Sequence, residues 1–316
     1  MILRFARRAS GVLTATLLAA VIASLLPLEV WALEILASFR VPLITLCFGS
    51  GLFALFVRLR AWAVFGFALA SIQILLSIPL FVAAGSNGDA SDARVRLRVL
   101  TMNVEWCNRE GDAVLSLIRS LEPDIVALQE IDYWWRRELE TLRDEFHFQT
   151  FDRLSARPGV GVLARQAPVA EEWHDLHGRA FVALRFGESE NSIGFANAHA
   201  FPPKSPRLYR LRNHQIDRLA ERLAAFETPL VLAGDLNATP WSPVLGAFER
   251  RTGLASARAG RGTLPTWPAW SRLFSFPIDH IHHSDAFLVE ELRRVPIPGS
   301  DHFGLFAVLS LSETRG

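Results

Sequence analysis

The stretch PLVLAGDLNATPWSP, residues 229–243, decides the fold. It opens with an apolar run, Leu230–Ala233, that predicts a buried strand, and it continues through Gly234 to Asp235 and Asn237. Residues i and i+2 of a strand share a face, so the carboxylate and the carboxamide are directed to the same side. Such a pair suits a metal-bound water or a phosphate oxygen, but Asp and Asn are also common in a plain turn. The stretch alone leaves both interpretations open.

Short strands alternate with amphipathic helices from Arg94 onward, which predicts an α/β fold. Polar side chains recur where these strands end, and loops at strand ends are common places for functional sites. Taken singly, each has a structural explanation, such as a helix-capping role for Glu130 or a satisfied core position for His199. Together they offer oxygen ligands for a hard cation and histidines that titrate near neutral pH. The set is Asn103, Glu130, His199, Asp235, Asn237, Asp279, Asp301 and His302.

Six short motifs follow one another in an order that resembles the endonuclease/exonuclease/phosphatase superfamily, which includes deoxyribonuclease I, abasic-site endonucleases, sphingomyelinases and inositol-phosphate 5-phosphatases. They are LTMN, PDIVALQE, ANAHA, GDLNATP, PIDHI and GSDH. Each motif is weak alone, but six in the family's order make a specific signal. The resemblance covers about residues 94–312 and implies a four-layer α/β sandwich, deoxyribonuclease I-like, with two β-sheets face to face and helices outside.

The same resemblance implies a metal site. Glu130 is similar to the family's metal-holding carboxylate, with Asn103 beside it, and Asp301 resembles an acid near the metal or a histidine. The implied cofactor is Mg²⁺, with Mn²⁺ as an alternative, because hard cations prefer oxygen ligands.

Catalytic roles are implied in the same way. Asp235 resembles the residue that orients or deprotonates the attacking water, and Asn237 the amide that positions the phosphate. His302 matches the terminal histidine, with Asp279 as its orienting carboxylate. His199 matches the strand-end histidine of deoxyribonuclease-like members, which pair it with an acid on an intermediate strand. The comparable stretch here, ARPGVGVLAR, contains no acid, so the partner of His199 stays unassigned.

Three charge-free apolar runs precede this region, at about residues 10–28, 41–57 and 61–84. Each is long enough for a bilayer-spanning helix, so residues 1–84 are interpreted as three transmembrane helices; the alternative is a signal peptide followed by core helices. Basic residues flank the first span and separate the second from the third, at Arg4–Arg8 and Arg58–Arg60. Basic loops stay in the cytoplasm, which predicts a multi-pass protein of the bacterial inner membrane with an extracytoplasmic catalytic domain.

A small, polar stretch at residues 85–93 reads as a linker, and residues 94–316 as the catalytic domain. Residues 90–316 carry 27 basic and 29 acidic side chains, a balance that disfavours binding of bulk DNA through its backbone. Two cysteines, Cys47 and Cys107, exclude a disulfide framework within the domain.

Two local features have competing interpretations. The histidines of the stretch DHIHHSD could indicate a zinc site. The favoured interpretation is that His280 is a structural residue and that His282 and His283 are surface residues. The aromatic loop at residues 265–277 is favoured as core, with contact to the bilayer as the alternative.

The sequence therefore predicts a membrane-tethered, divalent-metal-dependent phosphoester hydrolase that uses an activated water. Nuclease or other phosphodiesterase activity is favoured. The alternatives are a phospholipid head-group phosphodiesterase or phosphatase, and a catalytically silent membrane scaffold. The expected partners are a phosphoester substrate (nucleic acid, lipid or small phosphodiester) and the bilayer, with no protein partner predicted.

Overall fold

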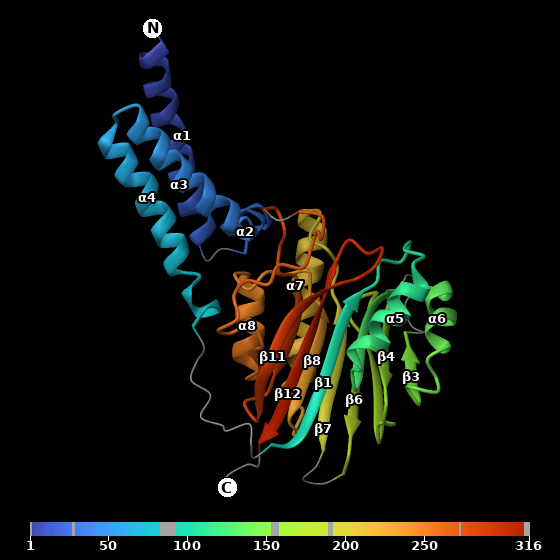
Figure 1. Cartoon of the computed structure of the whole chain (residues 1–316). Helices are drawn as coiled ribbons and strands as arrows, with labels where there is room; N and C mark the ends of the chain where they lie inside the picture. The colour runs from blue at the N-terminus through green and yellow to red at the C-terminus, as the bar shows by residue number, and fades with distance from the viewer. Residues whose placement is uncertain are drawn as a thin grey trace.

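The computed structural model describes residues 2–26, 29–82, 93–152, 158–188, 192–271 and 273–312. A bundle of apolar helices projects from an α/β body (Figure 1). The projection contains α1 (Ile2–Leu25), α2 (Trp31–Ser38), α3 (Arg40–Phe56) and α4 (Arg60–Leu75), followed by the short 3₁₀ helix η1 (Ile78–Leu80).

The body contains two six-stranded sheets, ordered β11-β12-β1-β2-β4-β3 and β5-β6-β7-β8-β10-β9. Each is a mixed sheet with one parallel pair at its centre, β1 with β2 and β7 with β8. The first sheet is built from β1 (Ala93–Asn103), β2 (Ile125–Ile131), β3 (Phe148–Phe151), β4 (Gly159–Ala164), β11 (Phe287–Pro296) and β12 (Phe303–Ser312). The second is built from β5 (Ala170–Asp175), β6 (Ala180–Phe186), β7 (Ile193–His199), β8 (Leu230–Asp235), β9 (Ala255–Ser256) and β10 (Asp279–His283).

Three apolar cores separate four layers of the body. One core lies between the sheets and takes side chains from both, including Val99 and Val231. A second joins the first sheet to α5 (Gly111–Leu121) and α6 (Tyr133–Glu140), and a third joins the second sheet to α7 (Pro206–Leu223) and α8 (Pro243–Thr252). The expected α/β architecture with two facing sheets is confirmed.

Local sequence explains where these helices begin and end. The helix α7 starts at Pro206 after Ser205, whose hydroxyl accepts a hydrogen bond from the backbone N–H of Leu208. A serine cap followed by proline at the first helical position is a strong start signal. The helix α5 ends at Glu122, which adopts a left-handed conformation before Pro123.

The expectation of three membrane-spanning helices is wrong. Among the described residues, only α1 is long and apolar enough to cross a bilayer by itself. The helices α2 and α3 would pass the same test only as one broken span, because they are bent by 68° at their junction. The third expected span contains α4, a helix of 16 residues that is shorter than a bilayer requires. The expected linker at residues 85–93 lies outside the described residues except for Ala93, where β1 begins.

Candidate active site

Both parallel strand pairs end at the same edge of the sandwich, and this brings the predicted polar residues together. In the first sheet, Asn103 pairs with Gln129, so Glu130 is the next residue along β2. In the second sheet, Asp235 pairs with His199 on one side and with Asp279 on the other. The polar row on β7, β8 and β10 therefore follows from strand register alone.

Backbone geometry at the end of β8 explains the glycine in GDLN. Gly234 has φ +152°, and a Cβ there would lie 2.1 Å from the backbone oxygen of Ala198 on β7. Only glycine allows this close approach of the two strands. The next turn is left-handed, with Asn237 at φ 49°, so the carboxamide folds back toward Asp235.

The carboxylate of Asp235 is buried and surrounded by donors. Its Oδ2 accepts hydrogen bonds from Nδ2 of Asn103 at 3.2 Å and Nδ2 of Asn237 at 3.1 Å, and lies 3.4 Å from Nε2 of His199. Burial by itself would raise the pKa of Asp235, but the hydrogen bond from His199, the charge of His302 and the hydrogen bond from the backbone N–H of Asn237 lower it. The carboxylate is therefore ionised at neutral pH and is held to accept a hydrogen bond from a water.

His302 and Asp279 form a buried pair, with Nδ1 of the imidazole 2.9 Å from Oδ2 of the carboxylate. Burial by itself would lower the pKa of His302, but the charge of Asp279 and its hydrogen bond outweigh burial and raise this pKa to about 10. Burial also raises the pKa of Asp279, although the charge of His302 opposes this rise. The pair places a protonated imidazole beside the cavity at neutral pH.

The partner of His199 is an arginine that the sequence did not reveal. Arg179, from the turn between β5 and β6, contacts Nδ1 of His199. An arginine only donates hydrogen bonds, so Nδ1 accepts, and Nε2 carries the hydrogen that faces Asp235. Burial and the charge of Arg179 lower the pKa of His199, which keeps this imidazole neutral. The two histidines of the site thus have opposite protonation states.

A second group of carboxylates faces the cavity from the first sheet and its loops. Glu130 accepts hydrogen bonds from Nδ2 of Asn103 at 3.3 Å and the backbone N–H of Trp106 at 3.2 Å. Glu105, which the sequence analysis missed, accepts a hydrogen bond from the backbone N–H of Asp301 at 3.0 Å. Its spacing two residues after Asn103 was the signal that could have found it.

This second group fits a hard divalent cation. Burial raises the pKa of Asp301, the charge of His302 and the hydrogen bond from Trp267 oppose this rise, and the nearby charges of Glu105 and Glu130 add to it. Ligand atoms of Asp235, Asp279 and His302 also lie within 4.8 Å of one another. The carboxylates of Glu105, Glu130 and Asp301 offer the oxygen ligands that a hard cation prefers, but among the described residues only Asp235, Asp279 and His302 have ligand atoms this close together.

These side chains surround a cavity of about 600 Å³. Glu105, Glu130, His199, Asp235 and His302 all line it. The cavity is thus large enough for a small substrate and contains both groups of polar residues.

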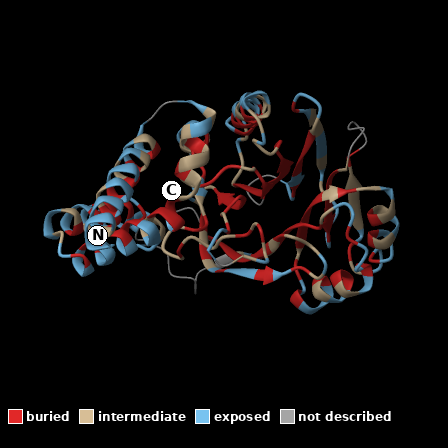
Figure 2. Cartoon of the chain, turned by 90° about the horizontal axis from the view of Figure 1, so that it is seen from above, coloured by how far each residue is buried: buried red, intermediate tan, exposed pale blue. Residues whose placement is uncertain are grey.

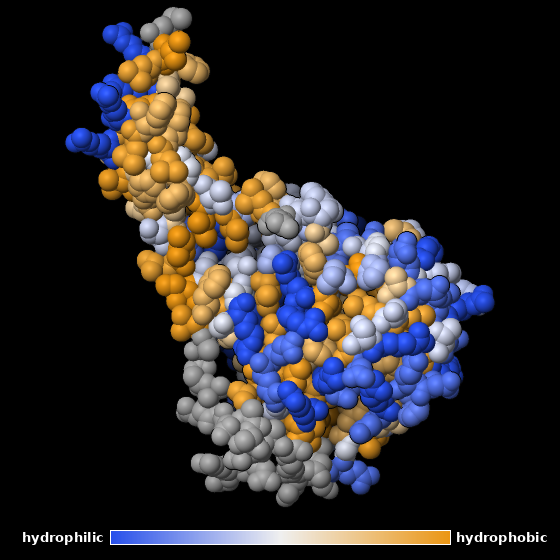
Figure 3. All heavy atoms as spheres, in the orientation of Figure 1, coloured by the Kyte–Doolittle hydropathy of each residue, from blue (hydrophilic) through white to orange (hydrophobic). Residues whose placement is uncertain are grey.

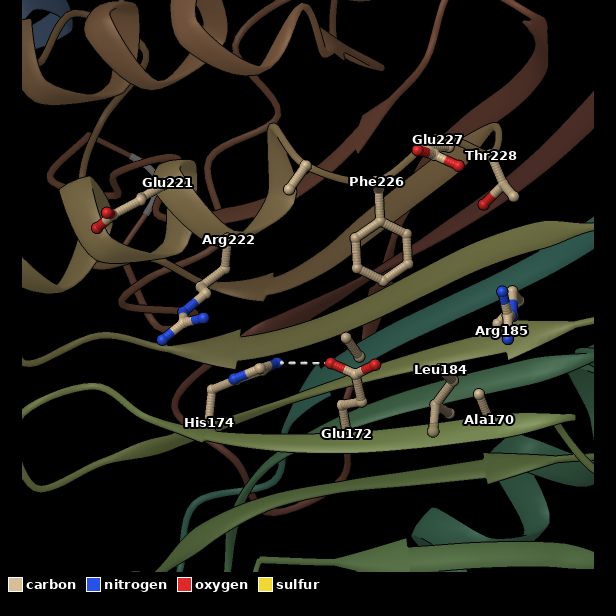
Figure 4. Close-up of a pocket in the computed structure, with 12 residues that line it drawn as sticks. Ala170, Glu172, His174, Leu184, Arg185, Glu221, Arg222, Phe226, Glu227 and Thr228 are labelled. Carbon is tan, nitrogen blue, oxygen red and sulfur yellow. Dashed lines mark ion pairs between the residues drawn. The ribbon is translucent and has the colours of Figure 1, made fainter.

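A second hollow of about 470 Å³ lies against the outer side of β5 and β6, near the end of α7 (Figure 4). His174 pairs with Glu172 there at 3.3 Å, and Arg222 from α7 faces them. Burial and the charge of Arg222 lower the pKa of His174. None of the predicted site residues lines this hollow, so the first cavity is the candidate active site.

The family model described as the endonuclease/exonuclease/phosphatase family matches residues 100–302, most of the chain. The chain belongs to this family. The match begins within β1 and ends at His302, so it includes every residue placed in the candidate site.

Solved structures of low sequence identity share the fold. A Bacteroides vulgatus endonuclease/exonuclease/phosphatase is similar at 18% identity and a TM-score of 0.59, covering 69% of this chain and 100% of that one. The human Nocturnin catalytic domain with bound sulfate is similar at 21% identity and a TM-score of 0.56, covering 70% and 96%. D. rerio TDP2 complexed with a single-strand DNA product is similar at 14% identity and a TM-score of 0.55, covering 68% and 99%. No curated protein matched the chain.

All eight predicted site residues lie around the one sheet edge, whereas the other histidines do not join them. His280 donates a hydrogen bond from Nε2 to the backbone oxygen of Ala238 at 2.8 Å, as a structural residue would. His282 and His283 are buried, so their expected surface position is wrong.

Proposed function

We propose that this protein hydrolyses phosphoesters with a divalent metal ion and a water oriented by Asp235. One observation supports the proposal above all: an ionised Asp235, held by Asn103, Asn237 and a neutral His199, opens into the same cavity as the protonated His302. A binding module would not need an ionised acceptor and a buried cation at one cavity.

The residues divide the reaction between them. Asp235 accepts a hydrogen bond from the attacking water and takes its proton as the new P–O bond forms. His302, held by Asp279, presents a positive charge to the phosphoryl oxygens as negative charge grows on them. The bond from phosphorus to the leaving oxygen breaks, and the products are an alcohol and a phosphate with one ester bond fewer. Asn237 orients the substrate through its carboxamide.

The carboxylates of Glu130, Glu105 and Asp301, with the carboxamide of Asn103, would hold Mg²⁺ or Mn²⁺. When bound, such an ion neutralises phosphate charge and polarises the phosphorus centre. Of these four residues only Asn103 contacts Asp235, so substitution of the Glu130 carboxylate tests metal dependence without removing a hydrogen bond to Asp235.

Phosphodiesters are the favoured substrates. D. rerio TDP2, which shares the fold, was solved with a single-strand DNA product, and human Nocturnin with a sulfate anion. Both ligands are consistent with a cavity that receives an anionic tetrahedral group, and a nuclease or other phosphodiesterase reaction is the corresponding proposal here.

A substrate panel tests this function. Purified full-length protein is incubated with plasmid DNA, a single-stranded oligonucleotide, RNA, phospholipids, inositol phosphates and bis-p-nitrophenyl phosphate, with Mg²⁺ and with a chelator. Turnover of at least one ester that is lost in chelator supports the proposal. Absence of turnover with every ester and metal would favour the silent scaffold instead.

We also propose that the projection anchors the protein to a bilayer through α1, which among the described residues is the one helix long and apolar enough to cross it alone, and that the body is extracytoplasmic. Its surface is apolar for most of its length, and hydrophilic side chains collect at the tip distant from the body (Figure 3). The Arg7 side chain donates to the backbone oxygen of Val57 at 3.1 Å, which places α1 beside the basic turn that contains Arg58 and Arg60. A basic tip stays on the cytoplasmic side. Alkaline phosphatase fused after Gly316 should be active; fluorescence of a cytoplasm-dependent reporter at that position would reverse the assignment.

A further inference from the structure

One face of α2 lines the active-site cavity. Trp31, Glu34, Ile35 and Ser38 all contribute to the lining, and Phe39 follows at the bend into α3. Positions separated by three and four residues lie on one side of a helix, so α2 presents a continuous stripe to the cavity. In Figure 1, α2 lies above the sandwich, near the end of the sheets at which β1 terminates. The projecting helices thus supply part of the site itself.

Buried polar contacts fix α2 in this place. Oε1 of Glu34 lies 2.5 Å from Nη2 of Arg212 on α7, and both side chains are buried. The same guanidinium donates through Nη1 to the backbone oxygen of Asn237 at 2.7 Å. The indole of Trp31 donates to the backbone oxygen of Pro203 at 2.7 Å. Breaking a buried ion pair is costly, so α2 is a fixed wall of the cavity.

The wall continues as aromatic rings down to the catalytic histidine. Phe39 packs edge to face on Phe276 with ring centroids 5.0 Å apart. The ring centroids of Phe276 and Trp267 are 6.4 Å apart, and those of Trp267 and His302 are also 6.4 Å apart. The aromatic side chains of the loop at residues 265–277 therefore have two different environments. Trp267 and Phe276 line the cavity, while Trp270 is 81% exposed and Phe274 48% exposed.

The wall includes the polar Glu34 and Ser38, but its apolar side chains are continuous in sequence and structure with the apolar projection. Leu36 and Phe39 pack against the core of the helical bundle, while Ile35 faces the cavity. Hydrophobic side chains cover the projection (Figure 3), and many residues on its outer face are exposed (Figure 2). An exposed apolar surface of this extent is typical of a bilayer-contacting segment. A molecule held in that bilayer would reach the cavity along α2.

We propose that α2 is a specificity element of the active site that binds the hydrocarbon part of a membrane-derived phosphoester, while the polar edge of the sheets binds its phosphate. This inference rests on the hydrolase function proposed above and adds the substrate class. Base stacking on the tryptophans would be the nucleic-acid alternative, but the stripe also includes Ile35, and the wall leads to the bilayer-facing bundle rather than to a basic groove.

Alkyl p-nitrophenyl phosphates test the proposal, because they share one reacting group and one leaving group. Water attacks phosphorus, p-nitrophenolate leaves, and an alkyl phosphate remains, so only the length of the alkyl chain varies. For full-length protein with methyl, butyl and octyl esters below their micellar concentrations, kcat/KM should rise by up to about fourfold for each methylene that the wall buries. Ile35→Asn should flatten this dependence, so that the ratio of kcat/KM for the octyl ester to that for the methyl ester falls toward one.

Val169→Asn is the matched control, since it makes the same kind of change at a side chain that is 50% exposed and does not line the cavity. Ile35→Leu should retain the chain-length dependence. If Ile35→Asn does not fold, the dependence of the wild-type kcat/KM on alkyl chain length still tests whether the site binds a hydrocarbon chain. Equal kcat/KM for methyl and octyl esters would overturn the inference while the hydrolase function stands, and no turnover of any ester would remove the function itself.

A nucleotide ester tests the alternative that α2 binds a nucleobase instead of a hydrocarbon chain. Thymidine 5′-(p-nitrophenyl phosphate) has the same leaving group and a base in place of the alkyl chain. The proposal predicts a lower kcat/KM for it than for the octyl ester. A higher value that falls in Ile35→Asn would show that α2 binds a nucleobase, which contradicts the proposal.

Discussion

The two sheets of the sandwich end at one edge but contribute opposite kinds of chemistry. The second sheet supplies His199, Asp235 and Asp279, which are at most 2% exposed and are each hydrogen-bonded to other protein groups. The first sheet supplies Glu130, which is only partly buried and accepts from one amide side chain and one backbone N–H.

The difference teaches how one site can handle protons and a cation together. Buried, hydrogen-bonded groups keep fixed protonation states, because their partners and not the solvent set their pKa values. A partly exposed carboxylate retains lone pairs for an ion that arrives with its own water. We therefore assign proton handling to the second sheet and cation binding to the first, and the predictions below test that division.

The largest effect is expected at Asp235. Asp235→Asn preserves shape but removes the charge that orients and deprotonates water, so kcat should fall by about 10²-fold or more while KM changes little. Steady-state rates measure this, with Asp144→Asn as the control at an exposed carboxylate outside the cavity. A wild-type kcat in Asp235→Asn would return GDLN to a plain strand-end turn.

The histidine pair should behave as one unit. His302→Ala should lower kcat by about 10²-fold, since a positioned cation is lost. Asp279→Asn should also lower kcat and shift the fall of activity at alkaline pH to lower pH, because the carboxylate raises the pKa of His302 to about 10. The double variant should be little slower than His302→Ala. Additive losses would contradict the pairing.

A change in the first sheet should alter metal use instead. Glu130→Gln keeps the shape but removes a charge, so the Mg²⁺ concentration for half-maximal rate should rise by about tenfold or more, a typical cost of disturbing a metal site. The Tm without metal should hardly move, as for the control Glu140→Gln at an exposed helix position. An unchanged metal titration would remove Glu130 from the site.

The smallest effect is expected on stability. The pKa of His302 is raised in the folded state to about 10, so its stabilising contribution is complete below the unfolded pKa of about 6.5 and is lost as pH rises through 10. Asp279→Asn should therefore cost about 1–3 kcal/mol of unfolding free energy near pH 7 and less above pH 10. Denaturant unfolding at both pH values measures it; a cost that grows with pH would contradict the assigned charges.

The sequence predicted the polar edge because strand ends are local features. Apolar runs ending in Asn103, Glu130, His199 and Asp235 can be read without knowing the partners, and the parallel pairs then place them side by side. The strands β3 and β5 carry no comparable signal, since Phe148–Phe151 and Ala170–Asp175 are short and only partly buried. A strand that is only partly buried shows little alternation of apolar and polar residues.

Long-range partners could not be predicted. Arg179 meets His199 across a hairpin, and Glu34 meets Arg212 over a separation of 178 residues. Nothing in their local sequence distinguishes them from surface charges. The helix lengths failed for a related reason, because apolar composition does not show where a helix ends. The helix α4 ends at Leu75, whereas the third apolar run continues to about residue 84.

Isotope-labelled water tests the central claim most directly. Wild-type protein is allowed to hydrolyse bis-p-nitrophenyl phosphate in H₂¹⁸O with Mg²⁺, and both products are analysed by mass spectrometry. A water oriented by Asp235 for attack on phosphorus predicts one ¹⁸O in the p-nitrophenyl phosphate and none in the p-nitrophenol, with this labelling rate reduced about 10²-fold in Asp235→Asn. Label in the p-nitrophenol, or equal rates in the two proteins, would contradict the account.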